Sequence, residues 1–174
     1  MVEVELASDS KPWSDPASWP SGNVPVEGDE VEIISGDWIE FDIEDSPILK
    51  SLTINGRLTF KNDTEEAVDR TLHAWWVFVR AGDLLIGSEE APYNGTATIK
   101  LYGDPIAAPI AFSMLTEGGN KGLFVVGEVK MYGQQRDQMS RLRATVEKGD
   151  KTATVYGGLD WKAGDQVSLL PTAI

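Results

Sequence analysis

A short pattern that occurs four times constrains the fold of this chain more than any other feature of the sequence. Each copy has two or more alternating apolar residues, a glycine, and then another alternating apolar run. The four copies lie in residues 31–41, 52–60, 77–86 and 123–131. Alternation places every second side chain on one face of a strand, and a glycine between two runs permits a bend at positive φ. Each copy is therefore predicted to be a strand, a bend and a second strand.

The spacing of these glycines favours a stack. Gly36 and Gly56 lie 20 positions apart, and Gly56 and Gly82 lie 26 apart, which is about the length of one turn of a parallel β-helix. We therefore predict an all-β fold, a short right-handed parallel β-helix-like stack of glycine-hinged strands. The alternative is a β-sandwich, which would need turn dipeptides every 8–12 residues or so. Further strands are expected at 96–102, 152–156 and 165–170.

The length of 174 residues indicates one domain. We expect residues 1–12 to be an N-terminal extension and residues 13–174 to form a single β domain. The Pro- and Trp-rich segment 12–25 is predicted to cover one end of the stack, with Trp13, Trp19 and also Trp161 packed inside the fold. No apolar run approaches the roughly 20 residues of a membrane helix, so direct membrane insertion is not expected.

The net charge of −13 argues against unspecific binding to nucleic acid or to anionic membranes. The acidic residues are concentrated in the first third of the chain. Basic residues gather later around a polar stretch, where Arg136, Arg141 and Arg143 are candidates for binding an anion.

Aromatic side chains are the other candidates for ligand binding, because sugars present apolar C–H faces that stack on aromatic rings. The candidate platforms are Trp38, Trp76, Tyr93 and Tyr102. Trp38 follows a predicted corner, where side chains often project into solvent. In the Trp75–Trp76 pair, alternation turns one ring inward, and we expect Trp75 to point inward and Trp76 outward.

The sequence assigns no catalytic residue, metal site or cofactor. With 28 acidic residues, pairs of carboxylates such as Asp37 with Asp42 arise by chance, and no motif raises any pair to a catalytic one. His73, the single histidine, is expected to be a packed or surface residue. Acid-rich loops leave structural calcium open, although none has the spacing of a known calcium loop.

Several segments, in order, resemble the G-eight (eight-glycine) domain family, which occurs in fibrocystin, in its fibrocystin-like relative and in the cell-surface and migration-inducing hyaluronidases. Residues 13–33 resemble the start of the domain. Residues 49–58 and 79–93 resemble its second and third glycine strands, and residues 97–103 and 159–167 resemble later landmarks. The resemblance covers nearly the whole chain after residue 12.

The resemblance implies an extracellular, β-rich module within a larger protein, continuous with further β-helix repeats. It also implies binding of a ligand or carbohydrate, without an established catalytic residue. The family's glycines correspond to Gly22, Gly28, Gly36, Gly56, Gly82, Gly87 and Gly103, with Gly127 or Gly133 completing the set. Two N-glycosylation acceptor triplets, at Asn62 and Asn94, fit a surface or secreted glycoprotein.

We therefore expect a noncatalytic extracellular recognition or scaffold domain whose partner is carbohydrate or another extracellular protein. One alternative is the N-terminal part of a polysaccharide-degrading, hyaluronidase-like β-helix enzyme. The other is a purely structural cap for a β-helix.

Overall fold

The structure, a computed structural model, describes residues 9–104, 106, 109–113 and 116–170. The chain divides into two compact units, one ending at Gln134 and the other beginning at Gln135. Most of the expected N-terminal extension lies outside the described residues, and Lys11–Pro12 forms the first strand. The expectation of one domain over 13–174 stays a prediction.

The first unit is built from β-strands. They are β1 (Lys11–Pro12), β2 (Glu30–Ile33), β3 (Trp38–Phe41), β4 (Ser51–Ile54), β5 (Arg57–Phe60), β6 (Arg70–Ala74), β7 (Trp76–Val79), β8 (Asp83–Ile86), β9 (Ala97–Leu101), β10 (Ala111–Ser113), β11 (Thr116–Glu117), β12 (Gly122–Val125) and β13 (Glu128–Met131). A single 3₁₀ turn, η1 (Pro16–Ser18), interrupts them among the described residues. The all-β prediction is confirmed, and each of the four repeated patterns forms the expected pair of strands.

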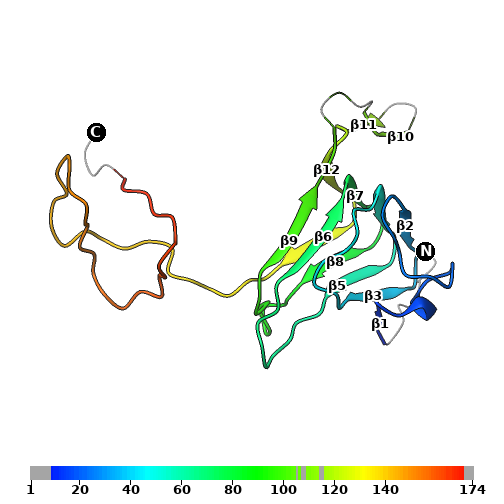
Figure 1. The fold of residues 1–174 in the computed structure, drawn as a ribbon, viewed down its shortest axis with the longest axis horizontal. Coiled ribbons are helices and arrows are strands. Elements are labelled where there is room, and N and C mark those ends of the chain that lie inside the picture. The colour runs from blue at the N-terminus through cyan, green and yellow to red at the C-terminus, as the bar shows by residue number, and fades with distance from the viewer. Residues whose placement is uncertain (1–8, 105, 107–108, 114–115, 171–174) are drawn as a thin grey trace. The chain divides into compact units, whose positions relative to one another are not determined.

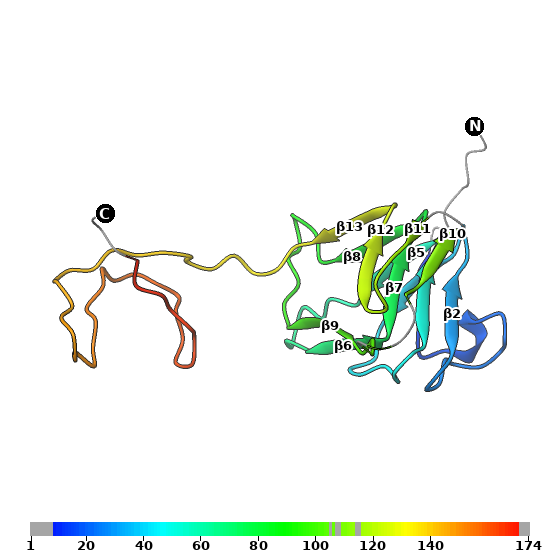
Figure 2. The same cartoon turned by 90° about the horizontal axis from the view of Figure 1, so that it is seen from above.

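Three parallel sheets organise these strands (Figures 1 and 2). Sheet A has the order β1-β3-β5-β8-β13, sheet B the order β12-β7-β4-β2, and sheet C pairs β6 with β9. Along the sequence a strand of sheet B is followed by one of sheet A, four times over, and we call each such pair a rung. Only β10 and β11 pair antiparallel among the described strands. A β-sandwich built from hairpins would have antiparallel pairs, so the parallel pairing disfavours that alternative. The right-handed β-helix-like stack stays a prediction.

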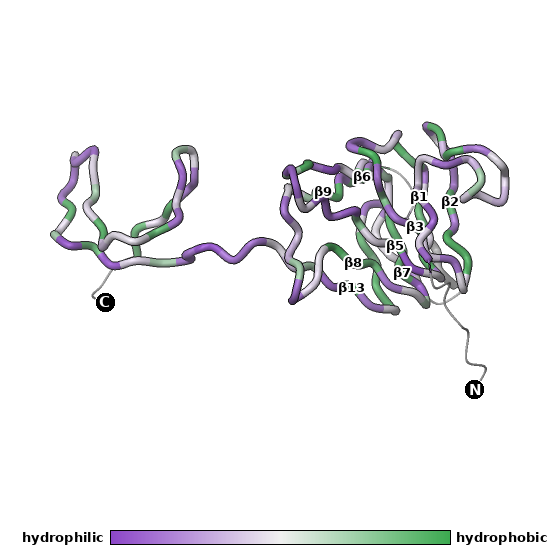
Figure 3. The backbone as a smooth tube through the Cα atoms, turned by 90° about the horizontal axis from the view of Figure 1, so that it is seen from below, coloured by the Kyte–Doolittle hydropathy of each residue, from purple (hydrophilic) through white to green (hydrophobic). Residues whose placement is uncertain are grey.

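The rungs stack in register, and this places like residues above one another. In sheet B, Val31, Leu52 and Val77 are aligned on adjacent strands, and all three are buried. Buried residues alternate with more exposed ones along β2, β3 and β5, and Figure 3 shows the matching alternation of hydropathy. Because every second residue faces the same interior, the repeated pattern builds one continuous core.

The first rung is covered by the segment that contains η1. Trp13 is fully buried and meets Trp19 and Phe41 edge-to-face, with ring centroids 4.7 and 5.2 Å apart. The Trp19 Nε1–H donates to the Trp13 carbonyl at 2.9 Å. The Asp15 carboxylate accepts from the Ala17 N–H at 2.9 Å and so caps the turn. The expectation that Trp13 and Trp19 pack inside the fold is confirmed.

Most glycines at the bends do not have the positive φ that the sequence predicted. Gly36 has φ +93°, but Gly56, Gly82 and Gly127 do not have positive φ. A Cβ on Gly82 would lie 1.7 Å from the Gly56 carbonyl oxygen, and one on Gly127 would lie 2.1 Å from the Gly82 oxygen. The predicted left-handed bend is therefore wrong at these three positions. They must be glycine because each α-carbon lies against the backbone of the rung before it.

The remaining family glycines fall into the same two groups. Gly22, Gly28 and Gly87 have positive φ, and a Cβ on Gly103 would lie 2.2 Å from the Asn120 carbonyl oxygen. Nothing lies within 4 Å of a Cβ placed on Gly133, and its φ is not positive. Of the two candidates for the last glycine of the set, Gly127 is thus the one whose backbone requires glycine.

The second unit has little regular structure. Leu142 and Val155 form an isolated antiparallel bridge, and the strands expected at 152–156 and 165–170 do not form. Trp161, expected to pack inside the fold, is only half-buried, and its indole N–H donates to the Asp137 carbonyl. No helix among the described residues is both long enough and apolar enough to cross a membrane.

Candidate functional site

Among the predicted platforms, Tyr102 lies in a group of titratable side chains. Its hydroxyl lies 2.7 Å from Nδ1 of His73, and Nε2 of His73 lies 3.1 Å from Oδ1 of Asp45. The Lys100 ammonium lies 5.5 Å from the centroid of the Tyr102 ring. We call this group of Asp45, His73, Lys100 and Tyr102 the Tyr102 surface.

Sheet C positions these groups. Strands β6 and β9 pair with His73 opposite Lys100. Alternation turns both side chains away from buried Leu72 and Ala74. Tyr102 follows β9 on the same face, and its backbone N–H donates to the Ala74 carbonyl at 3.0 Å. The segment that carries Asp45 joins the edge of β6 through a parallel bridge to Thr71.

The hydrogen bonds determine which tautomer a neutral His73 ring adopts. A carboxylate can only accept, so Nε2 carries the hydrogen that is directed at Asp45. In a neutral ring Nδ1 then accepts from the Tyr102 hydroxyl. The hydrogen bond from His73 is the main cause that lowers the pKa of Asp45, whose side chain is 71% exposed. The site thus presents an exposed carboxylate, an ammonium group and an aromatic ring held by its hydroxyl.

Trp38 lies on the outer face of sheet A and is half-buried. Its Nε1–H donates to Oγ1 of Thr59 at 2.8 Å. The Arg57 guanidinium lies 5.6 Å from the ring centroid and pairs with Asp83 at 2.9 Å. One face of the indole is therefore engaged by a cation of its own sheet, and Trp38 does not project from the corner into solvent as expected.

We expected Trp75 to point inward and Trp76 to point outward. The structure contradicts the first expectation and agrees with the second. Trp75 lies between β6 and β7 and is 43% exposed, whereas Val77 and Val79 are fully buried. Trp76 is half-buried and faces away from these valines. The alternation breaks at Trp75 because the chain turns there from sheet C to sheet B.

Tyr93 cannot serve as a platform because it is a core residue. It is 2% exposed and packs edge-to-face on Phe60, with centroids 6.3 Å apart. Its hydroxyl donates to the Val68 carbonyl at 3.1 Å and accepts from Nη1 of Arg70 at 3.3 Å. Arg70, itself 3% exposed, pairs with Asp63 at 2.6 Å. Sequence reasoning missed this buried ion pair.

The predicted anion site is not a free basic cluster. Arg136 is bound to Asp165 at 2.7 Å and to Asp160 at 3.5 Å. The Arg143 guanidinium lies over the Tyr156 ring, 5.6 Å from its centroid. Arg141 is exposed, and its carbonyl accepts from the Tyr156 N–H. The charge of Arg136 is therefore already neutralised by carboxylates of the same chain.

The acidic residues considered for catalysis have other partners. Asp37 pairs with Lys11 at 2.7 Å. Asp42 accepts from both the N–H and the hydroxyl of Ser14, at 2.9 and 2.6 Å. In the part of the chain that the structure describes, no group of three or more histidine or acidic side chains is arranged to hold a metal ion.

The chain is similar to domains of much larger proteins. The model of the G8 domain family matches residues 18–143. Mouse fibrocystin is 34% identical over 157 residues, which cover 88% of this chain and 4% of the mouse protein. Mouse fibrocystin-L is 30% identical over 173 residues, covering 92% of this chain and 4% of that protein. A G8 domain-containing protein of Dictyostelium discoideum is 28% identical over 179 residues, covering 97% of this chain and 12% of the protein.

No solved structure matches the chain significantly. The chain spans only a small part of the length of the curated relatives it matches. The family model covers most of the sequence, including the hinge glycines of all four rungs, and the chain belongs to the G8 domain family.

Proposed function

We propose that this domain is a noncatalytic recognition and scaffold module of a larger extracellular or cell-surface protein, and that it binds carbohydrate at the Tyr102 surface. The observation that carries the proposal is the convergence of Asp45, Lys100 and Tyr102 on one outer sheet face. Membership in a domain family whose relatives are many times longer supports the larger protein.

The chemistry of the Tyr102 surface suits a sugar. A carboxylate accepts hydrogen bonds from hydroxyl groups, an ammonium donates to them, and an aromatic edge or face contacts C–H groups. The His73 bond restrains the Tyr102 side chain before any ligand arrives, which lowers the entropic cost of binding. The Asp45 carboxylate is largely exposed to solvent, so its contact with a sugar is weak, and repeated modules in a larger protein would strengthen the binding.

The test is a glycan array followed by calorimetric titration of any sugar that binds. Tyr102→Ala and Asp45→Asn should each lower the affinity about tenfold, since each removes a contact of roughly 1–1.5 kcal/mol. Tyr156→Ala is the matched control, because Tyr156 is an exposed tyrosine in the second unit. Sugar binding that survives both Tyr102 surface substitutions would reject this site, and an array without hits would reject carbohydrate as the ligand.

The extracellular location rests on the family and not on the acceptor triplets. The Asn62 amide donates to the carbonyls of Ala91 and Pro92, and its oxygen accepts from the Asn94 N–H at 2.9 Å. Both asparagines thus tie one loop to the next. Expression with a secretion signal in a eukaryotic cell, followed by mass spectrometry, measures whether either carries a glycan.

A second candidate function is a cap for a longer stack of strands, and a separate observation supports it. The inward-facing row of Phe41, Phe60 and Ile86 is buried, but Met131 at the end of that row is 51% exposed. Val125 ends another such row and is 47% exposed. Within the first unit, tryptophans cover the first rung, and no described residue of that unit covers the last one in the same way. If the exposed apolar residues of the last rung bind another strand, the wild type should self-associate in a concentration-dependent way, and Met131→Lys should reduce this association in sedimentation experiments. A wild type that stays monomeric would count against this candidate.

A further inference from the structure

Among the described strands, none covers the edge of sheet B at β2 in the way that β1 covers the edge of sheet A. In sheet A, β1 lies on the outer edge of β3, pairing Lys11 with Ile39. Sheet B ends at β2, which pairs only with β4 among the described strands. An uncovered strand edge presents backbone N–H and C=O groups that another strand can bind.

The hydrogen bonds of β2 show which groups face this edge. The Asp29 carbonyl accepts from the Lys50 N–H, and the Ile33 carbonyl accepts from the Asn55 N–H, both at 2.9 Å. These odd-numbered residues therefore direct their backbone groups toward β4. Since backbone direction alternates along a strand, the N–H and C=O groups of Glu30 and Glu32 point to the free edge.

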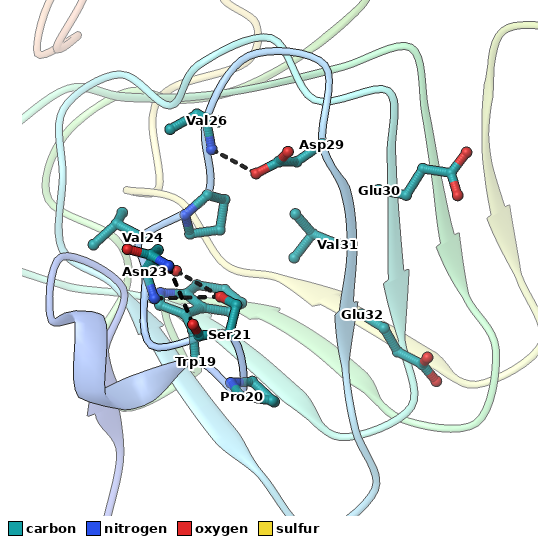
Figure 4. A pocket seen from close by; sticks show the side chains of 11 residues that line it. Trp19, Pro20, Ser21, Asn23, Val24, Val26, Asp29, Glu30, Val31 and Glu32 are labelled. Carbon is teal, nitrogen blue, oxygen red and sulfur yellow. Dashed lines mark hydrogen bonds between the residues drawn. The ribbon is translucent and has the colours of Figure 1, made fainter.

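A groove runs beside that edge (Figure 4). One wall is the loop from Trp19 to Val26 and the other is β2. Internal hydrogen bonds hold the loop, including those from the Asn23 amide to the Ser21 carbonyl and from the Val26 N–H to Asp29. The groove is thus bounded by hydrogen-bonded backbone on the loop side and by β2 on the other.

Acidic residues and no basic residue border the groove, and the acidic ones are Asp29, Glu30 and Glu32. The Asp29 carboxylate accepts from the Val26 N–H, and the Glu32 carboxylate accepts from the Asn55 side-chain amide at 2.6 Å. Glu30 pairs with Lys50 at 2.6 Å, but both side chains are more than 60% exposed, and such a pair contributes little. Figure 4 shows Glu30 and Glu32 on the side of β2 away from the loop.

We propose that the groove along β2 binds an extended basic peptide segment of a partner protein by strand addition. The peptide runs parallel to β2, as the other strands of sheet B do. Its lysine or arginine side chains then lie beside the carboxylates of Glu30 and Glu32, and the residues between them pair their backbone N–H and C=O groups with the free groups of these two glutamates. A second copy of this chain is disfavoured, because its own β2 would place like charges side by side. An apolar strand is disfavoured because it would desolvate the Glu30 and Glu32 carboxylates and add no new charged or polar partner for them.

The test uses the full chain and a synthetic six-residue peptide that alternates lysine with threonine. Amide resonances are followed in ¹⁵N NMR spectra during titration, and the changes should centre on residues 30–33. A peptide that alternates glutamate with threonine should not bind. A lysine peptide with proline in place of threonine should bind about tenfold more weakly or worse, since it cannot donate the same backbone hydrogen bonds.

Two variants at one position separate charge from backbone pairing. Glu32→Gln removes the charge alone and should weaken binding about threefold. Glu32→Pro also removes the edge N–H, which does not serve the β4 ladder, and should weaken binding by roughly a further tenfold. Glu65→Gln, an exposed acid outside the strands, is the control and should leave binding unchanged.

Four results would overturn the proposal. They are no binding at millimolar peptide, changes centred outside β2, equal affinity for the proline and threonine peptides, and self-association through β2 in place of peptide binding. The comparison of peptides does not depend on how any variant folds, so it decides the question even where Glu32→Pro is destabilised.

Discussion

Gly82→Ala tests the reason why the bends require glycine. The Gly56 carbonyl oxygen accepts the Asp83 N–H at 2.9 Å, and an alanine Cβ at position 82 would lie 1.7 Å from this same oxygen. The two rungs must therefore separate by more than 1 Å or one must rotate its peptide. Either response disturbs a ladder of strands spaced about 4.8 Å apart.

The magnitude follows from two contributions. Forcing extra atoms into a packed site costs about 1–3 kcal/mol, and losing the hydrogen bond to the Gly56 carbonyl costs about 1 kcal/mol more. We expect Gly82→Ala to lower the free energy of unfolding by roughly 3 kcal/mol, which corresponds to a decrease in Tm of about 10 °C for a unit of this size. Urea unfolding followed by tryptophan fluorescence measures the change.

Matched variants distinguish close approach from backbone strain. Gly133→Ala should be neutral or slightly stabilising, because nothing lies within 4 Å of the added Cβ and alanine restricts the unfolded chain. Gly36→Asn should cost little, since asparagine tolerates the positive φ found there, whereas Gly82→Asn should be as damaging as alanine. A Gly82→Ala variant within about 0.5 kcal/mol of the wild type would refute the reasoning.

Three further predictions concern side chains. Arg70→Met should lower the free energy of unfolding by about 1–3 kcal/mol, because it removes the charge-assisted hydrogen bond to Asp63 and the hydrogen bond to the buried Tyr93 hydroxyl; Asp63→Asn in the same chain should recover part of the loss in denaturant titrations. Arg136 lowers the pKa of Asp165 to about 2, so the stabilisation of the second unit by this pair should be present above the ordinary aspartate pKa of 3.8 and lost as the pH falls toward 2. NMR titration of the Asp165 carboxyl should show this midpoint in the wild type and a higher one in Arg136→Gln, and equal midpoints would contradict the pairing. Trp38→Ala should lower stability by about 1–2 kcal/mol, because the half-buried ring contacts Arg57 and Thr59; an unchanged melting curve would mean that the ring makes no net contribution.

The alternation of apolar residues determined much of the fold without any structure. Residues 31–41 and 77–86 could be assigned as paired strands, because a period of two places Val31, Ile33, Val77 and Val79 on one face wherever the strand lies. The same rule failed at Trp75, which lies at a corner where the chain leaves one sheet for another. Periodicity describes the inside of a strand and does not describe the residue between two strands.

The candidate site depended on contacts between residues far apart in the sequence. Tyr102 lies 29 positions from His73, and His73 lies 28 positions from Asp45. These distances are set by the lengths of the loops between stacked strands, and the sequence has no local pattern that encodes them. Tyr93 and Tyr102 look alike as candidates in the sequence, yet one is packed under Phe60 and the other faces outward.

The sequence by itself determined where the strands run, which of their faces is apolar and where glycine must stand. Only the tertiary structure decided why Gly56, Gly82 and Gly127 are glycine, since the atoms that exclude a side chain belong to the preceding rung. It also decided which polar groups meet on sheet C and which edge of sheet B is left open. The physical reason is that backbone conformation is a local property of the chain, whereas close approach and the exposure of an edge depend on which strands become neighbours.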